Sequence, residues 1–175
     1  DHVGGLITFL HTLNLGHGKS PIEIYGPQGL KVFIENITSL FGIEGVLNKI
    51  RIKEIETEGR SPREVLTTKK FNIIAFPTRH GIPSLGYIFK EKDIRKFDEE
   101  KAKVLGIPRS RLRKKLLKGE PITIRNRVIS PDEVTKVIRG RKIIYTGDTL
   151  PLVEYKDIFY GADLLIHEAT YLLSD

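Results

Sequence analysis

The sequence of 175 residues contains no cysteine, no methionine and no tryptophan. Without cysteine, disulfide bonds and thiolate metal sites are excluded, so only His, Asp and Glu side chains could hold a metal ion. The lack of disulfides fits a reducing compartment, and we expect the protein to be cytoplasmic. Apolar runs long enough to cross a bilayer are missing too, so no membrane partner is expected.

The missing methionine also bears on completeness. The chain offers no start residue and opens abruptly on Asp-His-Val-Gly-Gly at Asp1. We therefore expect a piece of a longer protein, of sufficient length for one domain with its own core.

Positive charge is present in excess. Lys and Arg number 29 against 22 Asp and Glu, which gives a net charge of +7 and a pI of about 9.5. An excess of this size favours a polyanionic partner such as nucleic acid, although it can equally serve solubility alone.

The apolar pattern alternates between the periods of helices and strands. Helical spacing after two glycines predicts a helix at 4–15, and the alternation in IRIKEIE predicts a half-buried strand at 50–56. Strands that alternate with helices are typical of a layered α/β fold. The other predicted elements are strands at 22–25, 71–80, 85–89, 142–145 and 162–166 and a helix at 30–42 that ends on a glycine.

The segment SPDEVTKVIRG, residues 130–140, carries the start signals of a helix. Ser130 suits the N-cap, Pro131 suits the first helical position, and two acidic residues follow in the first turn. We predict a helix through this segment.

A basic segment lies between Lys90 and Gly119, where aliphatic residues thin out and charges crowd together. Leu112, Leu116 and Leu117 stand at helical spacing, which predicts a short amphipathic helix. The charges on it either contact nucleic-acid phosphates or form an ordinary solvated face. Six of the ten residues from 109 to 118 are basic: Arg109, Arg111, Arg113, Lys114, Lys115 and Lys118.

Metal-capable side chains stand at four places where a predicted strand or loop ends. They are Asp1 with His2, then His80, Asp148 and His167. In layered α/β proteins such ends gather at one crevice, where imidazole and carboxylate groups suit Zn²⁺, or Mn²⁺ where carboxylates dominate. Each position alone could be structural, and it is the joint pattern that predicts a metal site.

The same motifs carry a resemblance to a known family. DHVGG, YGPQGL, RHGIPSLGYIF, LGIP…LKGE, YTGDTLP and ADLLIHEATY follow one another in this order between Asp1 and Tyr171. They resemble the motifs of ribonuclease Z, the tRNA 3′-processing branch of the metallo-β-lactamase-fold hydrolases. The resemblance implies an incomplete αβ/βα sandwich with an inserted basic arm. The implied division is a first part of the hydrolase core at 1–89, the arm at 90–120, and a second part of the core at 121–175.

Roles for single residues follow from the resemblance. It implies that Asp1 is a zinc ligand and the general base, and that His2 binds the same zinc. It further implies that His80 binds a second zinc and that Asp148 bridges the two ions. His167 would donate a proton to the leaving 3′ oxygen, a task that suits the unperturbed pKa of histidine.

Glu168 directly follows His167 and therefore points to the opposite side of the strand. It either holds the turn locally or orients a neighbouring side chain of the site from behind. The sequence leaves both roles open, with the structural one preferred.

The resemblance also implies the partners and the reaction. The complete protein would hold two zinc ions per active site, form a homodimer, and cut the 3′ trailer from precursor tRNA by two-metal phosphodiester hydrolysis. Because family ligands before Asp1 and after Tyr171 are missing, we expect this piece alone to bind zinc poorly and to be inactive. The alternatives are another phosphodiesterase or lactonase-like hydrolase on the same scaffold, and a non-catalytic RNA-binding paralogue.

Overall fold

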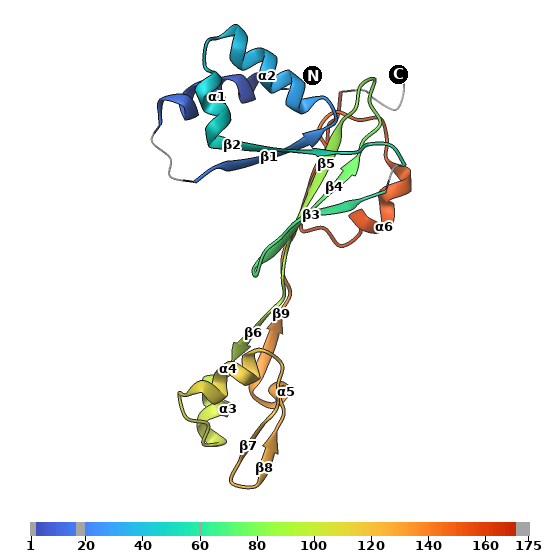
Figure 1. The fold of residues 1–175 in the computed structure, drawn as a ribbon. Coiled ribbons are helices and arrows are strands. Elements are labelled where there is room, and N and C mark those ends of the chain that lie inside the picture. The colour runs from blue at the N-terminus through green and yellow to red at the C-terminus, as the bar shows by residue number, and fades with distance from the viewer. Residues whose placement is uncertain (1–2, 17–19, 60, 171–175) are drawn as a thin grey trace. The chain divides into compact units, whose positions relative to one another are not determined.

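The computed structural model describes residues 3–16, 20–59 and 61–170, and it divides the chain into two compact units (Figure 1). The first unit comprises Asp1–Thr67, Asn72–Phe89 and Lys142–Asp175, and the second comprises Thr68–Phe71 and Lys90–Arg141. The predicted arm at 90–120 falls within the second unit, which continues to Arg141. The arm boundary predicted at 120 stays a prediction.

The first unit opens with a small parallel layer. In it, β1 and β2 pair in parallel, with Ile22 opposite Ile50. The two helices pack over a core centred on the fully buried Leu10, Ile34 and Val46. The elements are α1 (Gly4–Leu15), β1 (Ile22–Pro27), α2 (Leu30–Leu40), the 3-10 helix η1 (Glu44–Lys49) and β2 (Ile50–Ile55).

The ends of both helices are satisfied locally. The Lys49 ammonium donates to three carbonyl oxygens at the end of α1, those of Leu13, Asn14 and Gly16, at 3.1, 2.7 and 2.7 Å. A cation suits this end because the carbonyl groups there carry the negative end of the helix dipole. Helix α2 is followed by Gly42 at φ +66°, the left-handed conformation that glycine adopts readily at a helix end.

A five-stranded sheet forms the rest of the first unit, in the order β11-β10-β5-β4-β3. Strands β10 and β11 run parallel, and β3 and β4 form an antiparallel hairpin. Strands β4 and β5, which correspond to the strands predicted at 71–80 and 85–89, are neighbours in this sheet. The elements are β3 (Arg63–Thr67), β4 (Phe71–Pro77), β5 (Leu85–Glu91), β10 (Lys142–Tyr145), the 3-10 helix η2 (Val153–Tyr155), α6 (Lys156–Phe159) and β11 (Leu164–Ile166).

The core of this sheet is built around Phe76 of β4. Its ring is fully buried and meets the rings of Tyr155 and Phe159 edge-on, with centroids 5.2 and 5.4 Å away. Ile88 of β5 and Ile144 of β10 complete the cluster. This core fixes the central strands, whose ends carry the loops of the candidate site.

The second unit has a hydrophobic core of its own. Two antiparallel strand pairs, β6 with β9 and β7 with β8, form this unit together with three short helices. Its buried residues include Ala102, Ile107, Leu116 and Ile129. The elements are β6 (Ile94–Phe97), α3 (Glu99–Val104), α4 (Arg111–Leu117), β7 (Ile122–Ile124), β8 (Arg127–Ile129), α5 (Pro131–Val134) and β9 (Thr135–Ile138).

The helix predicted at 130–140 is wrong beyond Val134. The start signals are correct: the Ser130 hydroxyl accepts from the Asp132 amide, and the Glu133 carboxylate accepts from the Ser130 amide, which forms a capping box. After one turn the chain becomes β9, where Thr135 pairs with Phe97 of β6. The β-branched residues of this stretch suit a strand, and pairing with β6 overrides the local helix signal.

The amphipathic helix predicted in the basic segment is present as α4. Leu116 is fully buried and Leu112 is partly buried, whereas Leu117 is 40% exposed. The described helices include none with both the length and the apolar character that a membrane crossing requires.

Candidate active site and nucleic-acid interface

A cleft of about 840 Å³ lies in the first unit, where the loops after β4, β10 and β11 meet. His80, Asp148 and Glu168, three of the predicted site residues, line it together. They come from positions 68 and 20 residues apart in the chain (148 − 80 and 168 − 148). The cleft is further lined by Thr78, Arg79, Gly81, Thr149, Leu150 and Thr170.

Two hydrogen bonds from backbone amides hold the loops of His80 and Asp148 against each other. The Arg79 amide donates to the Thr149 hydroxyl at 3.0 Å, and the Leu150 amide donates to the Arg79 carbonyl at 2.8 Å. Thr149 itself is only 3% exposed. The neighbours of both predicted ligands are therefore fixed, which limits the positions that the ligands can take.

Glu168 ties the third loop to the second. Its carboxylate accepts from the Thr149 amide at 3.3 Å and from the Thr170 hydroxyl at 2.7 Å. The hydrogen bond from Thr170, more than any other contact, lowers the pKa of this carboxyl. Ionised Glu168 thus joins the loop after β11 to the loop that carries Asp148.

His167 lies at the surface, beside Glu168 at the end of β11. Its Nδ1 is 2.7 Å from the Glu168 carbonyl oxygen. Because a carbonyl oxygen can only accept, Nδ1 carries the hydrogen, and Nε2 is the nitrogen that can exchange a proton. Of these two residues, Glu168 lines the cleft. The role of His167 as proton donor stays a prediction.

The described residues do not by themselves form a metal site. His80 and Asp148 offer an imidazole and a carboxylate to one cleft, and both groups suit zinc. Within residues 3–16, 20–59 and 61–170, no three metal-capable side chains gather into a group that could hold an ion. The other two predicted ligands, Asp1 and His2, lie outside the described residues.

A second hollow of about 300 Å³ adjoins the same two side chains on another side. His80 and Asp148 line it together with Tyr25 and Tyr87. The Tyr87 hydroxyl donates to the Tyr25 carbonyl at 2.9 Å, and burial raises the pKa of Tyr87 to about 12. Tyr87 is thus a neutral packing residue that joins β5 to β1 beside the site.

Sequence reasoning missed the threonines that organise the cleft. Thr149 and Thr170 have no chemistry of their own that marks a site, yet both bond to Glu168. The available signal was their position, since Thr149 follows Asp148 directly and Thr170 closes the HEAT motif.

The basic residues at 109–118 of the second unit differ in how exposed their side chains are. Arg109, Arg111, Lys114, Lys115 and Lys118 are exposed. The Arg113 side chain is only 15% exposed and pairs with Glu99 at 2.8 Å. Its charge lowers the pKa of the Glu99 carboxyl, chiefly through their hydrogen bond. The five exposed residues can meet a phosphate backbone directly, whereas the guanidinium of Arg113 is engaged within the unit.

The fold and the cleft define the class of the protein. A mixed α/β arrangement carries its polar side chains on loops at the ends of sheet strands. The solved structure of human tRNase Z, short form, superposes with a TM-score of 0.61 at 25% identity, covering 97% of this chain and 54% of that one. The predicted class is confirmed: the chain has an α/β fold of the metallo-β-lactamase type and matches about half of that chain.

The particular relatives are ribonucleases Z. The enzyme of Pyrococcus abyssi is 41% identical over 177 residues, which cover 100% of this chain and 56% of the relative. That of Methanocaldococcus jannaschii is 38% identical over 175 residues, which cover 98% of this chain and 54% of the relative. No family model matches the chain. The predicted resemblance to ribonuclease Z is confirmed along the chain, which spans a little over half the length of these relatives.

Proposed function

We propose that the whole protein is a zinc-dependent endoribonuclease that removes the 3′ trailer from precursor tRNA. The observation that carries this proposal is the cleft in which His80 and Asp148 meet, because both stand in motifs that resemble those of ribonuclease Z. The likeness to ribonucleases Z along the entire chain supports the same reaction.

The proposed zinc ligands are Asp1, His2, His80 and Asp148, with Asp148 shared between two ions. Bound zinc would neutralise the phosphodiester charge and make hydroxide available near neutral pH. Asp1 would act as general base toward the attacking water. His167 would protonate the leaving 3′ oxygen through Nε2, since Nδ1 donates to the Glu168 carbonyl.

The second unit would supply affinity for the substrate. Its exposed basic residues would pair with RNA phosphates in a way that is independent of sequence and sensitive to salt. The protein would work as a homodimer in the cytoplasm. The net charge of +7 supports a polyanionic substrate.

The test of the metal role is Asp148→Ala in the whole protein. We expect bound zinc to fall together with cleavage of a precursor tRNA that bears a 3′ trailer. The loss of activity should be about 100-fold or more, because even outer partners of metal ligands cost 10- to 100-fold. The measurements are zinc content by elemental analysis and the initial cleavage rate.

The matched control is Asp157→Ala, which removes an exposed carboxylate from α6 of the same unit. It should leave both zinc content and cleavage unchanged. Full zinc content in the Asp148→Ala protein would contradict the bridging role. If the wild-type protein does not cleave precursor tRNA, the proposed function is wrong.

A further inference from the structure

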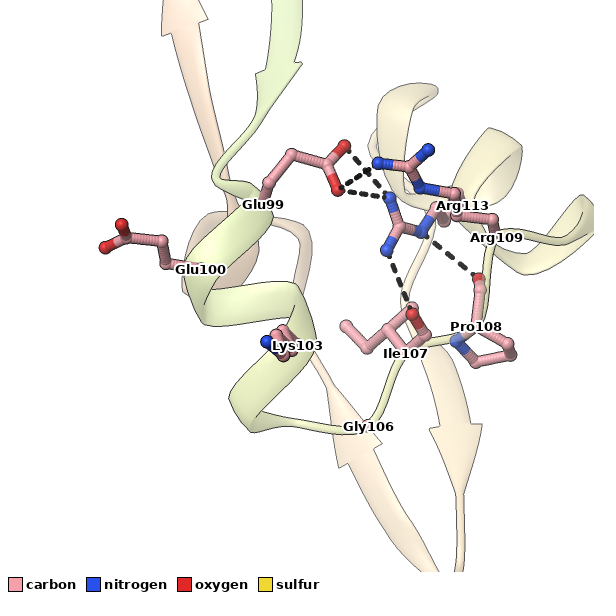
Figure 2. Close-up of a pocket in the computed structure, with 8 residues that line it drawn as sticks. All are labelled: Glu99, Glu100, Lys103, Gly106, Ile107, Pro108, Arg109 and Arg113. Atoms are coloured by element: carbon pink, nitrogen blue, oxygen red, sulfur yellow. Dashed lines mark hydrogen bonds and ion pairs between the residues drawn. The ribbon is translucent and has the colours of Figure 1, made fainter.

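An ion-pair cluster joins helices α3 and α4 of the second unit beside a hollow of about 490 Å³. Glu99, the first residue of α3, faces two guanidinium groups, those of Arg109 and Arg113 (Figure 2). Glu100 follows it on the same helix, and Figure 2 shows its carboxylate pointing away from both arginines. Two adjacent acids of one helix are therefore in different surroundings.

Arg113 forms the fixed part of the cluster. Its Nη1 donates to both Glu99 oxygens at 3.0 and 2.8 Å, its Nη2 donates to the Ile107 carbonyl at 3.1 Å, and its Nε donates to the Pro108 carbonyl at 3.2 Å. The guanidinium carbon also lies 5.1 Å from the centre of the Phe97 ring. Arg113 thereby ties α3, the loop after it and α4 into one piece.

Arg109 is held at the edge of this piece. The backbone before it is fixed by the Pro108 carbonyl, which accepts from both Arg113 and the Ser110 amide. The Ser110 hydroxyl then accepts from the Leu112 amide and caps α4. The Arg109 guanidinium stands 3.6 Å from Glu99 and is 83% exposed, so this contact orients it without burying it.

We propose that Glu99 is a positioning residue that presents Arg109 to a phosphate of the RNA substrate. The proposal rests on the proposed function, since it assumes that RNA binds at this unit. Glu99 would act in two ways, by anchoring Arg113 and by drawing the Arg109 side chain into one region of space. The phosphate would bind donors of the Arg109 guanidinium that do not face Glu99, so the contact with Glu99 is kept in the complex.

The physical basis is preorganisation. Fixing a long side chain on binding costs affinity, and a side chain that is already confined avoids about 3- to 10-fold of that cost. The single contact at 3.6 Å engages one end of the guanidinium, and the Arg109 side chain stays 83% exposed, so a phosphate can reach its other donors. Arg109 would then lose less side-chain conformational entropy on binding than the other exposed basic residues of this run.

The sign of the effect separates positioning from simple electrostatics. Glu99 is negatively charged, so its removal would strengthen RNA binding if charge alone mattered. Glu100→Gln removes the same charge one residue away and reports this purely electrostatic effect. Positioning predicts the opposite result for Glu99→Gln, namely weaker binding.

The experiment uses the whole protein with a precursor tRNA bearing a 3′ trailer, and measures its dissociation constant at several salt concentrations. We expect Glu99→Gln to weaken binding by about 3- to 10-fold and Glu100→Gln to leave it equal or slightly tighter. In an Arg109→Ala background, Glu99→Gln should not weaken binding further. Cleavage of a small phosphodiester should remain at the wild-type rate.

Each other outcome overturns the proposal. If the Glu99→Gln protein binds precursor tRNA as tightly as the Glu100→Gln protein, or more tightly, Glu99 does not position Arg109. A loss that persists in the Arg109→Ala background shows a general structural role. One lost phosphate contact changes the slope of log affinity against log salt by about one. If Glu99→Gln reduces that slope by several units, Glu99 likewise has a general structural role. If the wild type neither binds nor cleaves precursor tRNA, it is the proposed function that fails.

Discussion

At the scale of single residues, Arg111 and Arg113 have the same chemistry but different surroundings. Arg111 is exposed at the start of α4, whereas Arg113 is enclosed by Glu99, Phe97 and the chain that precedes α4. The sequence shows six basic residues in ten, and it correctly predicts a basic helical face. It cannot show which arginine is used internally, because the partners of Arg113 come from α3, β6 and the loop before α4.

Glu168 can be tested as the residue that holds the cleft together. Glu168→Ala removes the acceptor for both the Thr149 amide and the Thr170 hydroxyl. We expect the loop of Asp148 to loosen and the rate of phosphodiester cleavage to fall by about 10-fold or more, as for other residues that orient ligands. The measurement is kcat/KM of the whole protein toward a small phosphodiester.

Thr170→Val serves as the matched control for this change. It removes one partner of Glu168 but keeps the carboxylate and its hydrogen bond from the Thr149 amide. Its loss of activity should be smaller than that of Glu168→Ala. A Glu168→Ala protein as active as the wild type would show that Glu168 does not position the loop of Asp148.

At the scale of elements, the contact between β4 and β5 depends on a missing side chain. Gly86 of β5 faces the Phe76 ring so closely that a Cβ there would lie 2.3 Å from the ring carbon Cζ. Gly86→Ala should therefore displace Phe76 and destabilise the first unit by about 1–3 kcal/mol, the usual cost of overpacking. The measurement is the free energy of unfolding from a denaturant titration.

Gly81→Ala is the control for the glycine change. Nothing lies within 4 Å of the Cβ that it would add. It should alter the free energy of unfolding by less than about 0.5 kcal/mol, as is usual for surface substitutions. Equal destabilisation by both changes would mean that the Phe76 contact is not what requires glycine at position 86.

The elements that sequence predicts well are those whose signal is local. The apolar period places α1, α2 and β2 correctly, and Gly42 correctly ends its helix. The helix prediction for 130–140 is wrong in its second half because that half pairs with β6, a strand distant in sequence. Thr135 and Val137 are among the paired residues. In the site, the ends of strands bring His80 and Asp148 to one cleft. Their roles as ligands stay predictions, and Asp1 and His2 lie outside the described residues.

At the scale of the whole molecule, the chain separates a site from a basic face. The cleft with His80 and Asp148 belongs to the first unit, and the exposed basic run belongs to the second, which has a separate core. Because each unit has its own core, substitutions on the exposed face of the second should leave the chemistry of the first unchanged. Binding of a large substrate and reaction of a small one can then be measured independently.

This separation leads to the last prediction, made for the whole protein with Arg111, Lys114, Lys115 and Lys118 all changed to Ala. Arg113 is kept, because its loss would break the contacts that join α3 to α4. We expect precursor tRNA to bind at least 10-fold more weakly, with a slope of log affinity against log salt reduced by about three to four. The rate on a small phosphodiester should not change.

A second variant, with Arg113→Ala alone, completes the comparison. It removes only one charge, so a purely electrostatic account predicts a change in the salt slope of about one. The structure instead predicts loss of stability in the second unit, since Glu99 and the carbonyls of Ile107 and Pro108 lose their shared partner.

The four-residue variant also has an outcome that would contradict its prediction. An equal loss of activity on precursor tRNA and on the small phosphodiester would show that the basic face is not a separate binding surface.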